Sequence, residues 1–155
     1  MVIFEQTLRQ LLIESNLVAG RVFLMRSPQA PAPLADPPYI VFFPVAPIDQ
    51  QGTETHGGPL NVITRLYQMS IFDNSQSRAL AIADSLRMYL DGWRGDYLNC
   101  HIGHIFPVTQ SIGDETDTRL FQVIAEYRIM FRFISYDPPA VPTRTTNRNK
   151  QEQQR

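Results

Sequence analysis

Two segments of the chain repeat hydrophobic residues at three- and four-residue spacing, which is the pattern of an amphipathic helix. In the segment from Val2 to Ser15 the repeating positions are Ile3, Phe4, Leu8, Leu11 and Leu12. In the segment from Gln76 to Asp91 they are Ala79, Ile82, Ala83, Leu86 and Leu90. Ser75 stands where a side chain caps the second helix and Gly92 where that helix can end, so we predict a helix in each segment.

Alternating or continuous apolar residues predict four strands, which are Arg21–Met25, Tyr39–Val45, Val62–Phe72 and Thr118–Ser135. The last strand places aromatic and aliphatic residues on one parity and Gln122, Glu126 and Arg132 on the other, so one of its faces should be buried. The segment from Tyr39 to Val45 is apolar on both parities. It therefore predicts a strand covered on both faces, or one whose second face meets another subunit.

Proline-rich and polar segments separate these elements. Five prolines fall between Ser27 and Pro38, which excludes a helix and an interior strand there. A polar, glycine-containing segment from Gln50 to Pro59 is longer than a tight hairpin turn needs. From Pro138 to Arg155 the chain lacks aromatic residues and is rich in Arg, Asn and Gln, so we predict a disordered tail.

These elements together predict an α+β fold. We expect a mainly antiparallel, twisted sheet of about four to five strands with two main helices packed against it, long loops and a disordered C-terminal tail. Residues 1–137 would form the α/β domain, and residues 138–155 a flexible tail rich in Pro, Arg and Gln. A chain of 155 residues supports one such domain with its own core and is too short for two ordinary ones.

The charge and cysteine content narrow the possible functions. A net charge of -1 gives no global attraction to nucleic acid or to an acidic membrane, so any such contact must be local. The single cysteine, Cys100, permits no intramolecular disulfide and suits a reducing cytoplasm. We find no signal peptide and no apolar run of the roughly 18 to 20 residues that span a bilayer, so we expect no membrane contact.

Residues 101–104 spell HIGH, the letters that mark the ATP site of class I aminoacyl-tRNA synthetases. In those enzymes the motif lies where a parallel strand passes into a helix whose N-terminus helps to hold phosphates. Here the β-branched residues that follow favour a strand, and Pro107 interrupts any helix that opens at Gly103. The chain also lacks a KMSKS-like lysine loop and a GxxxxGK[ST] phosphate loop. We interpret the segment as a strand or loop in which His101 and His104 alternate with Ile102 to face solvent or an interface. A small nucleotide-binding enzyme that uses these histidines is the alternative from a different class.

Other chemistry-bearing residues form weaker patterns. Cys100, His101 and His104 offer three ligands where a structural zinc site needs four. The acidic residues between Asp114 and Asp117 share a glycine-containing loop, which is more typical of a solvated turn than of paired catalytic carboxylates. No GxSxG sequence supports a serine nucleophile. We therefore expect no catalytic residue, no metal, no cofactor and no enzymatic activity.

Several short segments follow one another in a particular order: Gly20–Phe23, Pro28–Gln29, Pro38–Phe42, Arg65–Phe72, Ser77–Arg87, Leu90–Gly92 and the closing strand from Thr118. In this order and spacing they resemble the tail completion family of long-tailed bacteriophages, whose members are also called tail terminators or tail-to-head joining proteins. The resemblance covers about residues 8 to 134. The resemblance depends on the order and spacing of the segments, because each motif is short and unspecific. It supplies no catalytic residues.

The resemblance implies a small subunit that assembles as a hexameric ring at the head-proximal end of the tail tube. Such a ring ends tube polymerisation and joins the tail to the head connector. The implied partners are further copies of the chain, the major tail tube protein and the head-completion or connector protein. Genomic DNA would pass through the lumen without sequence-specific binding. The implied location is the virion tail or neck, after assembly in the host cytoplasm.

Two sets of residues are candidates for contacts in such a ring. Long ordered loops in small domains usually have a role. The candidates for contact with the tube or connector are therefore Pro28, Gln29, Pro31, Gln50, Gln51, Gly52, Thr53, Glu54, Thr55, His56, Gly57 and Gly58. Surplus apolar surface and uncovered sheet edges point to oligomer contacts. The candidates for contact between subunits are Tyr39, Val41, Phe43, Arg128 and Arg132.

Three alternatives stay open at this point. Both apolar strands could pack within a monomer, with the two loops simply mobile. Another neck component, such as a head-closure protein, would share the small size and ring assembly. A monomeric nucleic-acid binder could act through the basic residues of the tail, which are Arg144, Arg148, Lys150 and Arg155.

Overall fold

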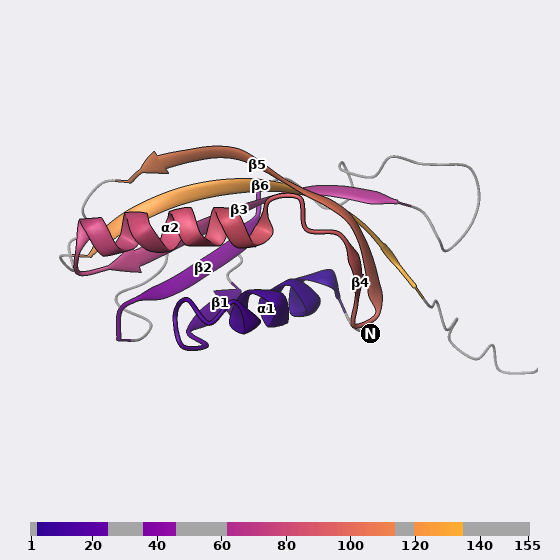
Figure 1. Cartoon of the computed structure of the whole chain (residues 1–155), viewed down its shortest axis with the longest axis horizontal. Helices are drawn as coiled ribbons and strands as arrows, with labels where there is room; N and C mark the ends of the chain where they lie inside the picture. The colour runs from indigo at the N-terminus through magenta and orange to yellow at the C-terminus, as the bar shows by residue number, and fades with distance from the viewer. Residues whose placement is uncertain (1–2, 25–35, 46–61, 114–119, 135–155) are drawn as a thin grey trace, which may run out of the picture.

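The computed structural model of the 155-residue chain describes residues 3–24, 36–45, 62–113 and 120–134 (Figure 1). Within these ranges the helices are α1 (Phe4–Glu14) and α2 (Gln76–Leu90). The strands are β1 (Val22–Leu24), β2 (Tyr39–Pro44), β3 (Ile63–Asp73), β4 (Gly95–Tyr97), β5 (Cys100–Ile112) and β6 (Phe121–Phe133). The predictions for the proline-rich loop, the glycine-containing loop and the C-terminal tail fall on residues outside these ranges.

Both predicted helices are confirmed. α2 begins after Ser75, whose Oγ accepts a hydrogen bond from the N–H of Arg78 at 3.5 Å and so caps the helix. Gly92 follows the end of α2 with a φ of 73°, a left-handed conformation that suits glycine. α1 has no side-chain cap at Ile3, so its stability depends more on packing against the rest of the fold.

The strands form a single mixed sheet in the order β1-β2-β3-β6-β5-β4. β1 pairs with β2 in parallel, and the other pairings are antiparallel. The expectation of about four to five mainly antiparallel strands is therefore wrong in number, and it missed the parallel pair. The pattern missed β4 because three residues are too few to show alternation. It could not reveal the parallel pair because side chains alternate in the same way in both kinds of pairing.

Both helices pack on the same face of the sheet, which we call the helix-bearing face. Figure 1 shows α2 running along the long strands over one half of their length, with α1 below it. The parity of β6 that was predicted to be buried faces these helices, and its fully buried members are Val123, Ala125, Tyr127, Ile129 and Phe131. Phe4 of α1 stacks on Phe131 with ring centroids 3.6 Å apart and an interplanar angle of 8°. The apolar core thus joins α1, α2 and the sheet.

Strand β5 is long, irregular and partly open along its outer edge. Its register with β6 shifts between Ile102 and His104 and again between Pro107 and Thr109. β4 pairs with this edge only as far as Ile102, and the N–H of Gly92 then donates to the carbonyl of Ile105 at 3.1 Å. Beyond Ile105, no other strand in the described ranges pairs with the outer edge.

Candidate assembly surface

Glu5, Arg65 and Tyr67 form a polar network within the helix-bearing face. Oε1 of Glu5, on α1, accepts a hydrogen bond from the Tyr67 hydroxyl at 2.7 Å and forms an ion pair with Arg65 at 3.0 Å. The Arg65 guanidinium also lies 5.3 Å from the ring centroid of Phe131. Burial, and then the charge of Glu5, raises the pKa of Tyr67, so this tyrosine stays a neutral donor. The network therefore anchors α1 to β3 inside the core.

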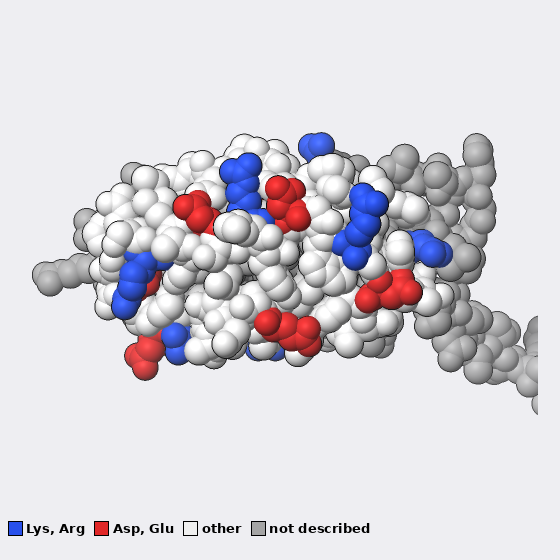
Figure 2. All heavy atoms as spheres, viewed as in Figure 1, with Lys and Arg blue, Asp and Glu red and all other residues white. Residues whose placement is uncertain are grey.

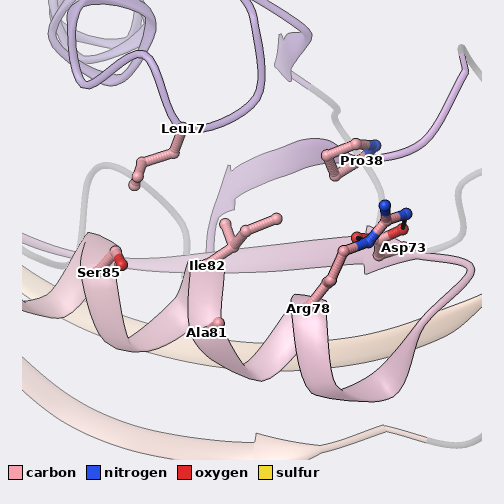
Figure 3. A pocket seen from close by; sticks show the side chains of 7 residues that line it. All are labelled: Leu17, Pro38, Asp73, Arg78, Ala81, Ile82 and Ser85. Atoms are coloured by element: carbon pink, nitrogen blue, oxygen red, sulfur yellow. Dashed lines mark hydrogen bonds and ion pairs between the residues drawn. The ribbon is translucent and has the colours of Figure 1, made fainter.

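A hollow of about 240 Å³ lies between α2, the start of β2 and the turn after α1 (Figure 3). Its lining is Leu17, Pro38, Asp73, Arg78, Ala81, Ile82 and Ser85. Figure 3 shows Asp73 and Arg78 pointing toward each other, and Arg78 donates to both carboxylate oxygens at 3.0 and 2.7 Å. The N–H of Asn74 donates to the same carboxylate at 2.7 Å. Both charged groups are thus engaged with their neighbours, and the pair secures the turn between β3 and α2.

The HIGH segment lies inside β5, so of the two predicted possibilities, a strand or a loop, the structure has the strand. His101 hydrogen-bonds to Asp96 across the β4–β5 pairing. The ring of His104 packs on the ring of Phe106 with centroids 3.8 Å apart, and Nη2 of Arg94 lies 3.3 Å from Nδ1 of His104. A strand interior does not provide the array of free N–H groups with which a helix N-terminus holds phosphates.

Cys100 and His101 point to opposite sides of β5, as neighbours in a strand do. Cys100 is fully buried, and burial raises the pKa of its thiol. Among the residues that the structure describes, no group of three His, Cys, Asp or Glu side chains is placed to hold a metal ion. Nor is any helix in those ranges long and apolar enough to cross a membrane.

The other face of the sheet, which we call the helix-free face, has two different ends. At one end Tyr39, Val41, Phe72 and Leu120 form a small buried cluster separate from the main core. The alternation of β2 accounts for this separation, because Ile40 and Phe42 belong to the main core. At the other end, β5 and β6 place basic and apolar side chains beside one another.

We define the β5–β6 patch as His104, Phe106, Arg128, Met130 and Arg132. Cross-strand pairing places Arg128 next to Phe106 and Met130 next to His104. Phe106 is 43% exposed and Met130 37% exposed. Arg128 is exposed and Arg132 half-buried, and neither forms an ion pair within the described part of the chain.

Acidic residues near this patch are engaged elsewhere. Asp96 is bound to His101, and Glu126 accepts a hydrogen bond from Thr109 at 3.3 Å. The patch therefore combines apolar surface with positive charge that forms no ion pair among the described residues, a composition that suits a protein contact with a partly acidic partner. Figure 2 shows the molecule from the same side as Figure 1. On this side basic and acidic side chains are interspersed, and neither sign gathers in one area.

The residues predicted from the sequence to make contacts fall into three groups. The loop candidates, Pro28 to Pro31 and Gln50 to Gly58, lie outside the described residues. Tyr39, Val41 and Phe43 are 2%, 3% and 7% exposed, so their side chains are already largely covered within one chain. The last group, Arg128 and Arg132, falls within the β5–β6 patch.

Sequence reasoning missed the apolar members of the patch. Met130 carried a usable signal, since it is an apolar residue on the polar parity of β6, between Arg128 and Arg132. Phe106 carried no such signal, because the register shifts on either side of it hide the face to which it belongs.

The fold of this chain also occurs in a known protein. No family model matches the chain, and no curated protein matches it. One solved chain, from the virion of a native gene transfer agent (GTA) particle, aligns with a TM-score of 0.55 at 15% identity. That alignment covers 83% of this chain and 90% of the other. A second solved structure aligns with a TM-score of 0.46 at 16% identity, over 87% of this chain and 98% of the other, and this value supports no argument. At such identities the likeness establishes a shared fold, and the chain is thus similar in fold to a chain of that virion particle.

Proposed function

We propose that this chain is a structural virion protein that assembles as a ring, a hexamer, at the head-proximal end of a tail tube. There it ends tube polymerisation and joins the tail to the head connector. The observation that carries the proposal is the fold shared with a chain of a gene transfer agent virion over most of both chains. The order of segments that resembles tail completion proteins, found without reference to the fold, agrees with it.

Surface composition supports an assembling subunit. The helix-free face keeps exposed apolar side chains in the β5–β6 patch, next to arginines that form no ion pair with any residue the structure describes. Apolar surface of this kind is covered when subunits associate. Because Tyr39, Val41 and Phe43 have little surface left to offer, we place the subunit contact at Arg128 and Arg132.

The proposed partners are further copies of the chain, the major tail tube protein and the connector or head-completion protein. Genomic DNA passes through the ring without sequence-specific binding. The protein is assembled in the host cytoplasm, resides in the tail or neck of the virion and catalyses no reaction. The loop from Gln50 to Gly58 and the segment from Pro28 to Pro31 contact the tube or connector in this proposal.

The test is the mass of the purified protein by light scattering, alone and mixed with tail tubes, with the same samples viewed by electron microscopy. We expect a hexameric mass, or rings at one end of each tube. A strict monomer that ignores tubes would refute the proposal. Rings that bind the head connector and leave tubes uncapped would instead identify a head-closure protein.

A loop deletion tests the contact surfaces separately. Removal of Gly52 to Gly58 is expected to leave the ring intact and to abolish the joining of heads to tails, measured as the yield of infectious particles in a complementation assay. A matched replacement of the same residues by a Gly/Ser segment of equal length separates the loss of specific contacts from the loss of length. Normal particle yields from the deletion would show that this loop makes no essential contact.

A further inference from the structure

The outer surface of α2 carries an exposed ridge, which we define as Asp84, Met88 and Asp91. These residues are four and three positions apart, so they share one side of the helix. That side is turned away from the stripe formed by Ala79, Ala83, Leu86 and Leu90, which packs on the sheet. Met88 is 85% exposed, so it presents nearly its whole side chain to solvent.

The charges of the ridge are acidic at both ends. Asp84 accepts one hydrogen bond, from Gln110 at 3.2 Å, and Asp91 forms no ion pair with any described residue. Arg87 is the base nearest to them along the helix, and it lines a small hollow with Tyr127 and Pro107. No ion pair joins Arg87 to Asp84 or Asp91 among the described residues, so the ridge keeps a methionine between two carboxylates.

The β5–β6 patch has the complementary composition. Phe106 and Met130 offer a half-exposed apolar surface, and a methionine packs well against both an aromatic ring and another thioether. Arg128 and Arg132 stand beside them without acidic partners in the described ranges. An apolar centre flanked by bases matches an apolar centre flanked by acids.

We infer that the α2 ridge of one copy of this chain docks on the β5–β6 patch of the next copy. This inference rests on the proposed function, because it names the surfaces through which the ring closes. Met88 enters the surface between Phe106 and Met130, while Asp91 faces Arg128 and Asp84 faces Arg132.

The position of the two surfaces makes the contact directional. The ridge lies on the helix-bearing side of the sheet and the patch on the helix-free side. Contacts between two different surfaces repeat head to tail, and such a series closes into a ring when its rotation allows. In a two-fold dimer the ridge and the patch of one copy would have to meet the patch and the ridge of the same partner at once, which two surfaces on opposite sides of one sheet do not allow. The placement of the two surfaces therefore favours a ring over a dimer.

The experiment measures oligomer mass against concentration by sedimentation velocity, in the presence of the same tail tubes if the free chain needs them to assemble. Met88→Gln and Arg128→Glu are each expected to raise the concentration for half-assembly at least tenfold. Two matched exposed positions outside both surfaces serve as controls. Ile112→Gln matches the first substitution and Asp36→Arg matches the size of the charge change, and both should assemble like the wild type.

A charge exchange distinguishes direct contact from general damage. Asp91→Arg alone should weaken assembly, and Asp91→Arg combined with Arg128→Glu should restore it to within about threefold of the wild type, because positions 91 and 128 then face each other with their charges exchanged and still opposite. Each variant must keep the melting temperature of the wild type, which separates loss of docking from loss of fold.

The outcomes separate the inference from the function on which it rests. Wild-type rings together with unaffected Met88→Gln and Arg128→Glu variants would overturn the inference and leave the ring standing. Loss of tube capture or of salt-sensitive DNA binding at unchanged oligomer mass would also overturn it, because the patch would then serve another partner. A wild type that stays monomeric with and without tubes would refute both.

Discussion

The two faces of the sheet are built from the same strands and differ in what they cover. On the helix-bearing face, side chains of β3, β5 and β6 meet α1 and α2 and are almost fully buried. On the helix-free face, the alternate residues of the same strands are polar, basic or half-exposed apolar, except for the cluster around Tyr39. One face thus accounts for most of the stability of the subunit, and the other remains available for partners.

From this difference we predict which substitutions change stability and which change assembly. Changes on the helix-bearing face should lower the free energy of unfolding, since they create cavities or leave buried polar groups without hydrogen-bond partners. Changes at the β5–β6 patch should leave the free energy of unfolding nearly unchanged and alter assembly. Paired substitutions of the same kind, one on each face, therefore test whether the two faces differ in this way.

Phenylalanine truncation is expected to give the largest contrast. Phe131→Ala removes a buried ring that stacks on Phe4, and we expect a loss of about 3 to 5 kcal/mol in the free energy of unfolding. Phe106→Ala removes a 43% exposed ring on the other face, and we expect a loss below about 1 kcal/mol. Urea denaturation of both variants measures the difference. Equal losses would mean that the helix-free face is as much a part of the core as the other.

Neutralising a glutamate on each face gives a smaller contrast. Glu5→Gln keeps the shape of the side chain and removes the charge that faces Arg65, so we expect a loss of about 2 kcal/mol in the free energy of unfolding. Glu126→Gln leaves only an exposed hydrogen bond with Thr109 weakened, and its effect should stay within about 0.5 kcal/mol. A cost for Glu5→Gln no larger than that for Glu126→Gln would show that the buried network adds nothing to stability.

Alkaline pH should weaken the helix-bearing face selectively. Burial raises the pKa of Tyr127 to about 12, and it also raises the pKa of Tyr67. An unfolded tyrosine ionises near a pKa of about 10, so above that pH the unfolded chain holds fewer protons than the folded one. The free energy of unfolding should therefore fall as the pH rises from about 10 toward 12. Urea titrations across this range should show a shallower fall for Tyr127→Phe, and an unchanged slope would contradict the assignment.

The cap of α2 should give the smallest effect. Ser75→Ala removes the side chain that accepts the N–H of Arg78, and we expect a loss of about 0.5 to 1 kcal/mol in the free energy of unfolding. Ser85→Ala, an exposed change within the same helix, should be neutral or slightly stabilising because alanine has the higher helix propensity. Thermal melts of both variants make the comparison. Equal melting temperatures would show that packing alone holds the start of α2.

Periodicity allowed the helix-bearing face to be predicted from the sequence. The stripe of α2, with Ser75 before it and Gly92 after it, and the buried parity of β6 follow directly from residue spacing and local capping. These signals are local, so a single chain displays them. Local signals also correctly excluded a helix in the HIGH segment, because Pro107 and the β-branched neighbours act within a few residues.

Pairing between strands could not be predicted in the same way. The mixed sheet order, the short β4 and the two register shifts of β5 depend on contacts between residues far apart in the sequence. The candidate surface was found in part: Arg128 and Arg132 are polar residues on a mostly apolar strand, whereas Phe106 joins them only through the register of β5 against β6. The exposure of Met88 depends on which side of α2 meets the sheet.

The outer edge of β5 has a consequence for how the protein behaves at high concentration. Unpaired strand edges invite other chains to add strands and grow into fibrils. Ile105 directs its carbonyl outward to Gly92, so Pro107, two residues further, faces the same edge and lacks the N–H that an added strand would need. The bulge that follows Pro107 bends the edge as well. The edge of β5 is thus protected against amyloid-like growth, and many copies can gather at one place without forming fibrils through it.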